Sequence, residues 1–112
     1  MGSDGTIPAA SRTAVRVRAR HRCERCGVPS PNGHWHHRRS RRVRERHRHC
    51  PCNGVWLCAT SHQQVHGGQK GVNARDNGFV VTQWAKQPGM IPVNTYLGKM
   101  FLDCDGGFTL EA

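Results

Sequence analysis

The chain has 112 residues, enough for one domain with a small core, because a domain of this size buries only roughly 65% of the surface that its unfolded chain exposes. Only 36% of the residues are hydrophobic and six are Cys, so we expect metal ions or cross-links to supplement packing. No segment approaches the roughly 20 apolar residues of a membrane span, and no secretory core precedes residue 12, which excludes an integral membrane protein. We expect a cytoplasmic protein whose reduced thiols ligate metal rather than form disulfides.

The formal net charge of +10 is concentrated in one part of the chain. Thirteen of the fourteen Arg lie between Arg12 and Arg48, whereas four of the seven acidic residues lie beyond residue 75. Guanidinium groups match phosphate bidentately, so this distribution favours nucleic acid as the partner over a merely solvated basic tail.

The first elements in chain order are a leader, a basic segment and a cysteine motif. Residues 1–11 are expected to be a disordered leader, residues 12–112 the domain, and residues 12–49 its basic part. Within Thr13–Arg22, apolar and Arg residues alternate, which fits a strand by its period, although a short Arg-rich helix is an alternative. Cys23-Glu24-Arg25-Cys26-Gly27 is a Cys-x2-Cys knuckle, whose two thiolates can converge on one metal ion.

Next comes a predicted strand, strand, helix series over about residues 34–67. His34–Arg38 and Val55–Leu57 are expected to pair as a hairpin, with an Arg-rich loop over Arg38–His49 between them. Ser61 and Gln64 fit a capping box, which predicts a helix starting at about His62. In that helix His62 and His66 would share one face.

The C-terminal part, residues 79–110, is predicted to add strands. Asn73–Asn77 can add a helical turn, and Phe79–Trp84 has strong β-propensity. Met100–Leu102 and Phe108–Leu110 are expected to form a closing hairpin, because Asp105-Gly106-Gly107 supplies the positive φ values of such turns.

These residues together resemble the HNH endonucleases, particularly the small zinc-knuckle type encoded by bacteriophages. The resemblance runs from about Arg20 to Val93. It is carried by Cys23-x2-Cys26, His36-His37-Arg38, Asn53 followed by Val55-Trp56-Leu57-Cys58, His62-x3-His66, and Ala74-Arg75-Asp76-Asn77-Gly78-Phe79 leading to Ile91-Pro92-Val93. Each motif alone is weak, whereas all of them in this order are specific.

The resemblance implies an α+β fold of the ββα-metal (His-Me finger) type with a zinc knuckle and a C-terminal β-hairpin. It implies that His36 and His62 bind one catalytic divalent ion, with His66 as a third ligand or a phosphate contact. His37 would be the general base, and Asn53 would fix the hairpin loop and orient His37. The chemistry is consistent, since imidazole can take a proton from water near neutral pH and a metal can stabilise charge on a phosphate. Adjacent strand residues point to opposite faces, so we expect a backbone bend at His36 and His37.

The structural zinc is expected to be held by Cys23, Cys26 and Cys58. Zinc-knuckle relatives complete the site with a second Cys pair, but Ser61 stands at the last position here. The fourth ligand can then be Cys50, Cys52 or water, or the zinc can be lost. Cys104 is expected to be an unliganded thiol.

DNA is the expected substrate, cut by hydrolysis into 5′-phosphate and 3′-hydroxyl ends, as a nick or a double-strand break. The catalytic ion would be Mn, Ni, Zn or Mg, and a nitrogen-rich site favours the transition metals over Mg²⁺. The expected DNA contacts are Arg38, Arg39, Arg41, Arg42, Arg44, Arg46 and Arg48. A phage terminase is a candidate partner through genome packaging, with homing and restriction as competing processes, and the protein would act as a monomer or dimer on DNA. The alternative function is a non-catalytic zinc-containing nucleic-acid-binding module, which needs neither His37 nor Asn53.

Overall fold

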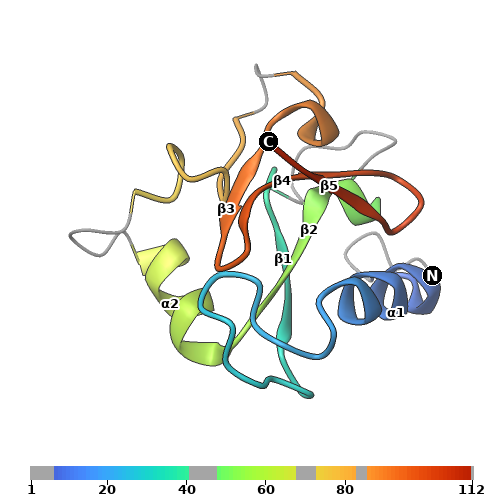
Figure 1. The fold of residues 1–112 in the computed structure, drawn as a ribbon, viewed down its shortest axis with the longest axis vertical. Helices are drawn as coiled ribbons and strands as arrows, with labels where there is room; N and C mark the ends of the chain where they lie inside the picture. The colour runs from blue at the N-terminus through green and yellow to red at the C-terminus, as the bar shows by residue number, and fades with distance from the viewer. Residues whose placement is uncertain (1–6, 41–47, 68–72, 83–85, 112) are drawn as a thin grey trace.

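The structure, a computed structural model, describes residues 7–40, 48–67, 73–82 and 86–111. In these ranges the predicted α+β class is confirmed, with two helices and two antiparallel sheets (Figure 1). The elements in chain order are α1 (Ala9–Arg18), β1 (His34–His37), β2 (Gly54–Leu57), α2 (Ala59–Gly67), β3 (Val93–Thr95), β4 (Gly98–Leu102) and β5 (Phe108–Leu110). Short 3₁₀ turns lie at Pro51–Asn53 (η1) and Pro88–Met90 (η2). No helix of the described ranges combines the length and apolar composition needed to cross a bilayer.

Helix α1 resolves the open choice for the basic segment in favour of a helix. Its buried residues Ser11, Val15 and Arg18 follow a helical spacing, whereas Val17 is exposed. The expected disordered leader over residues 1–11 is wrong at its end, because α1 begins at Ala9 and the Ser11 hydroxyl donates to the His49 carbonyl at 2.6 Å. Residues 1–6 lie outside the described part.

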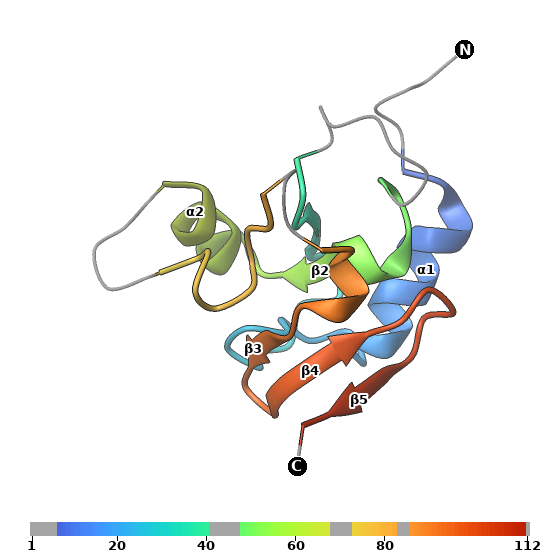
Figure 2. The same ribbon diagram turned by 90° about the horizontal axis from the view of Figure 1, so that it is seen from above.

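Strands β1 and β2 form the predicted antiparallel hairpin, with His36 opposite Val55 and His37 opposite Gly54. The helices α1 and α2 lie on opposite sides of this hairpin (Figures 1 and 2). Trp35 and Trp56 pack with Val15 of α1 and with Ala19, which directly follows that helix. Side chains alternate along a strand, so the same pairing sends His34 and His36 to the other face, toward α2.

Helix α2 confirms the predicted helix but begins at Ala59 rather than about His62. The predicted capping box is therefore wrong. The Cys58 sulfur accepts the Ser61 amide at 3.3 Å and so takes the capping role, while the Gln64 side chain accepts a bond from Arg25 at 2.6 Å.

The C-terminal region forms a three-stranded sheet, β3-β4-β5, beside the hairpin (Figure 2). The predicted β4–β5 hairpin is confirmed, with Leu102 opposite Phe108, and Gly106 has φ of +89° in the connecting turn. The β3–β4 pair was not expected. A strand over Phe79–Trp84 is wrong for residues 79–82, which form no ladder, and residues 83–85 lie outside the description.

The main core joins the hairpin, α2 and the C-terminal sheet. Its buried members are Cys23, Cys52, Val55, Leu57, Val65, Phe79, Val93, Met100 and Leu102. The predicted turn at Asn73–Asn77 is present, with the Asn77 amide on the Asn73 carbonyl at 3.0 Å. Gly78 follows with φ of +81°, and a side chain there would collide with the Pro92 carbonyl. This turn brings the Gly78 and Phe79 carbonyls to the functional site.

Candidate functional site

The structure brings Cys23, Cys26 and Cys58 together, as expected for the knuckle. Their sulfur atoms lie within 4.8 Å of one another, and those of Cys26 and Cys58 are 3.9 Å apart. Tetrahedral zinc with Zn–S bonds of about 2.3 Å separates neighbouring sulfurs by roughly 3.8 Å. The three thiols therefore fit three corners of a zinc tetrahedron.

The Ser61 hydroxyl faces the fourth corner of this cluster. It lies 3.4 Å from the Cys23 sulfur, and Ser61 is buried. Burial of the Cys58 thiol opposes its ionisation and raises its pKa. Hydrogen bonds from the Ser61 hydroxyl and amide and from the other two thiols outweigh this effect, so that the pKa of Cys58 is lowered to about 7. Cys58 is thus prepared to be a thiolate ligand.

A fourth ligand from Cys50 or Cys52 is wrong. Both thiols lie with Cys104 in a separate cluster. Cys104, which was expected to be an unliganded thiol, lies within reach of two other potential ligands. The prediction of a fourth knuckle ligand rested on the short separation in sequence between Cys50 or Cys52 and Cys58. It failed because the 3₁₀ turn η1 redirects the chain before β2 begins.

A buried ion pair positions the knuckle. The Arg18 guanidinium binds the Glu24 carboxylate through two bonds of 2.7 and 3.0 Å, and Glu24 also accepts the Trp56 amide at 2.8 Å. Arg18 donates further to the carbonyls of Pro51 and Gly54. One charged pair therefore ties α1, the knuckle and β2 together.

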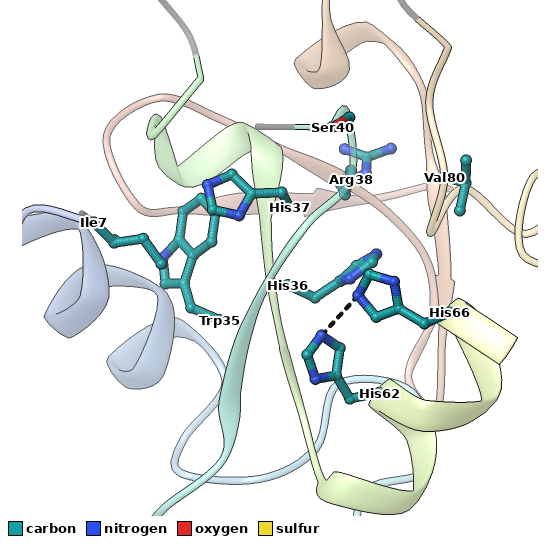
Figure 3. Close-up of a pocket in the computed structure, with 9 residues that line it drawn as sticks. All are labelled: Ile7, Trp35, His36, His37, Arg38, Ser40, His62, His66 and Val80. Carbon is teal, nitrogen blue, oxygen red and sulfur yellow. Dashed lines mark hydrogen bonds between the residues drawn. The ribbon is translucent and has the colours of Figure 1, made fainter. Parts of the chain in front are cut away.

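The second cluster consists of His36, His62 and His66, whose ligand nitrogens also lie within 4.8 Å of one another (Figure 3). Strand β1 supplies His36, and consecutive turns of α2 supply the other two on one face. The Nε2 atoms of His62 and His66 are 3.0 Å apart. The predicted juxtaposition of these three residues is thus present.

The hydrogen bonding of His36 tests whether this cluster suits a metal. Its Nε2 lies 2.6 Å from the Phe79 carbonyl oxygen, to which it must donate, while its Nδ1 is buried without a hydrogen-bond partner in the described structure. An imidazole held through one nitrogen by a carbonyl, with the other nitrogen open to a ligand, is the usual arrangement of a metal-ligating His. The residues fit a divalent ion bound by nitrogen ligands.

The lowered pKa values of His36 and His62 favour the neutral form of imidazole, which is the form that binds metal. Burial lowers the pKa of His36 to about 4, and the surrounding imidazoles lower it further against the Phe79 bond. Burial and the neighbouring His66 and His34 likewise lower the pKa of His62 to about 4. Neutral imidazole nitrogens carry the lone pair that a metal requires.

His37 projects from the opposite face of β1, beside Trp35 (Figure 3). Its Nε2 lies 3.1 Å from the Nδ1 of His49. The expected backbone bend between His36 and His37 is wrong, because regular pairing runs through His37 and the chain bends only at Arg38 and Arg39. A cavity of about 610 Å³ nevertheless reaches both faces around the strand end. Its lining residues are Ile7, Trp35, His36, His37, Arg38, Ser40, His62, His66 and Val80.

Asn53 holds the two ends of the loop that joins the strands. Its side-chain oxygen accepts the Arg39 amide at 2.7 Å, and its nitrogen donates to the carbonyls of Arg39 and Arg48. The loop-fixing role agrees with the expectation. These bonds go to backbone atoms of Arg39, two residues after His37, and of Arg48, one residue before His49.

Two of the arginines expected to contact DNA are interior residues. Arg38 is 1% exposed and donates to four carbonyls, those of Cys52, Gly78, Pro88 and Ile91. Arg39 is 4% exposed and donates to the carbonyls of Thr82 and Lys86. Their guanidinium groups are occupied by backbone carbonyls, so this structure gives no support to their assignment as DNA contacts. Arg41, Arg42, Arg44 and Arg46 lie outside the described residues, and Arg48 is half-buried.

Sequence reasoning missed His49 and the Phe79 carbonyl. His49 lay within a run of basic residues whose composition gave no reason to single it out, and a backbone carbonyl leaves no sequence signal.

No family model, curated protein or solved structure matches this chain.

Proposed function

We propose that the protein is a metal-dependent endonuclease of the HNH type, with a ββα-metal fold, that hydrolyses DNA phosphodiester bonds. The observation that carries the proposal is one cavity lined both by the three-histidine cluster and by His37. Such a cavity can bring a metal ligand set and a proton acceptor to the same phosphate. The basic chain, with a net charge of +10, supports a polyanionic substrate.

The histidines divide the chemistry between them. His36, His62 and His66 would hold one divalent ion, which would stabilise negative charge on the phosphate and on the leaving 3′ oxygen. His37 would accept a proton from the attacking water, and an imidazole is suited to this at neutral pH. His49 keeps the His37 ring in one orientation through the 3.1 Å contact. The products would carry 5′-phosphate and 3′-hydroxyl ends.

The remaining features support this arrangement mechanically. Asn53 fixes both ends of the loop that follows His37, and the Phe79 carbonyl fixes the ring of His36. Cys58, the last thiol of the knuckle cluster, lies directly before α2, which bears His62 and His66. Zinc in the knuckle would therefore set the start of the helix that carries two ligands.

The direct test is cleavage of supercoiled plasmid by wild type and His37→Ala, with DNA binding measured in parallel. We expect His37→Ala to lose cleavage and to retain binding. His21→Ala is the matched control, since His21 is exposed and does not line the cavity. Normal cleavage by His37→Ala would exclude His37 as the base. Binding by wild type without cleavage in any of Mn²⁺, Ni²⁺, Zn²⁺ or Mg²⁺ would instead support the non-catalytic nucleic-acid-binding module.

A further inference from the structure

A third group of potential ligands lies apart from both clusters of the candidate site. The thiols of Cys50, Cys52 and Cys104 lie within 4.8 Å of one another, and the sulfurs of Cys52 and Cys104 are 3.8 Å apart. Cys50 immediately precedes η1, Cys52 lies within it, and Cys104 lies in the turn after β4. Residues more than fifty positions apart in the chain thus present three sulfurs to one point.

The spacing of these sulfurs suits a metal ion. Neighbouring thiolates on tetrahedral zinc are separated by roughly 3.8 Å. The Cys52–Cys104 separation has this value and agrees with the 3.9 Å between Cys26 and Cys58 in the knuckle. Cys52 is buried, Cys50 is half-buried and Cys104 is exposed, so the protein provides three corners and solvent reaches the cluster at Cys104.

The turn that carries Cys104 is held by its own hydrogen bonds. The Asp103 carboxylate accepts the amides of Asp105 and Gly107 at 2.9 and 2.8 Å, and the Asp103 amide donates to the Gly107 carbonyl at 3.1 Å. Cys104 is therefore presented from a closed turn, which reduces the entropy lost when its thiolate is fixed.

Charges of both signs lie near this site, with the carboxylates of Asp103 and Asp105 on either side of Cys104 and a guanidinium beside Cys52. The buried guanidinium of Arg38 donates to the Cys52 carbonyl at 3.0 Å, and its described hydrogen-bond partners are all carbonyls. Three thiolates with one divalent cation carry a single negative charge. A zinc-thiolate cluster here would place its negative charge beside the Arg38 guanidinium, whose described hydrogen-bond partners include no carboxylate.

We propose that Cys50, Cys52 and Cys104 form a second zinc-thiolate site, which fastens the turn after β4 to the segment containing His49 and Asn53. The site binds one Zn²⁺ through three thiolates and one water and releases the thiol protons to solvent. It is structural, because its sulfurs do not line the cavity that contains His37. The inference does not depend on nuclease activity.

The test measures zinc content and thiol protection rather than cleavage. Protein purified under reducing conditions is analysed for zinc per chain, and Co²⁺ substitution reports thiolate ligation through its sulfur-to-metal charge-transfer band. We expect Cys104→Ser to lose one equivalent of thiolate-bound metal and Cys58→Ser to lose another, with both lost in the double variant. Asp105→Asn, which changes an exposed neighbour of Cys104, should retain the full amount.

Alkylation of the unmodified chain provides a second measurement that does not rely on variants. Exposed Cys104 should react rapidly with a maleimide in the zinc-free protein and at least tenfold more slowly after zinc is added. Equal zinc content and equal Co²⁺ spectra in wild type and Cys104→Ser would overturn the proposal. So would unchanged alkylation of Cys104 with zinc, or a zinc-free Cys52–Cys104 disulfide in the protein as isolated.

Discussion

The Nδ1 atom of His49 lies 3.1 Å from the Nε2 atom of His37, and the two rings meet nearly edge to face at 67°. Both residues flank the Arg-rich loop, one at each end. The Ser11 hydroxyl from α1 donates to the His49 carbonyl, so the basic N-terminal helix contributes to the position of the proposed base. In the proposed mechanism His49 would be a positioning residue rather than a catalytic one, because it would act through His37.

His49→Ala is expected to lower kcat for plasmid cleavage by on the order of 100-fold, since a misplaced general base loses the alignment of the reacting atoms. KM for DNA should change little, and His49→Gln should recover part of the rate because its side chain can still hydrogen-bond His37. Steady-state kinetics on a fluorescent duplex separates these parameters. An unchanged kcat in His49→Ala would contradict the positioning role.

Removal of one charge from the Arg18–Glu24 pair is expected to lower the free energy of unfolding by about 3–5 kcal/mol, because the partner charge stays buried and unpaired. Urea denaturation of Glu24→Gln and Arg18→Met measures this loss. The matched control is Lys99→Met, which breaks the exposed Lys99–Glu111 pair at 4.0 Å and should cost less than about 1 kcal/mol. Comparable losses for the buried and exposed pairs would refute the structural importance of Arg18–Glu24.

Ser61→Cys is expected to tighten zinc binding at the knuckle by on the order of tenfold or more, because a thiolate replaces a hydroxyl at the fourth corner. Competition with a chromophoric chelator gives the affinity. Thr60→Cys adds the same thiol one residue earlier in α2, at an exposed position, and should leave the affinity unchanged. Equal affinities of Ser61→Cys and wild type would show that Ser61 does not face the ion.

Arg38→Met is expected to cost about 3–5 kcal/mol of stability, since four buried carbonyls lose their donor. Thermal and urea unfolding should detect this loss. Arg12→Met, an exposed substitution in α1, should leave stability nearly unchanged. If Arg38→Met weakened DNA binding without reducing stability, Arg38 would be a DNA contact after all.

Cleavage with Mn²⁺ or Ni²⁺ is expected to exceed cleavage with Mg²⁺, because His36, His62 and His66 offer nitrogen ligands and Mg²⁺ prefers oxygen. Rates are compared after chelation and readdition of each metal. Equal or faster cleavage in Mg²⁺ alone would contradict a three-nitrogen ligand set.

The sequence predicted those parts of the molecule that depend on local pattern. Alternation and turn residues located the β1–β2 hairpin and the β4–β5 hairpin, and the four-residue spacing placed His62 and His66 on one helix face. The start of α2 was wrong because the sulfur of Cys58 caps it, a role that Ser61 was expected to fill. A sulfur cap has no strong sequence signature.

The remaining errors arose from long-range contacts. The grouping of Cys104 with Cys50 and Cys52 depends on where β4 ends in space, and the burial of Arg38 depends on four carbonyls from three separate segments. Composition indicated that Arg residues would meet phosphate. It could not distinguish a surface guanidinium from one that stabilises irregular backbone in the interior.

The four carbonyls on Arg38 also have a consequence for the folding reaction. They belong to residues 52, 78, 88 and 91, so the guanidinium is fully desolvated and satisfied only when η1, the Asn73–Asn77 turn and η2 are assembled together. An intermediate with part of this set would bury a charge without its partners. Partially assembled states are thereby disfavoured, and the hairpin and the C-terminal sheet should unfold in one cooperative transition.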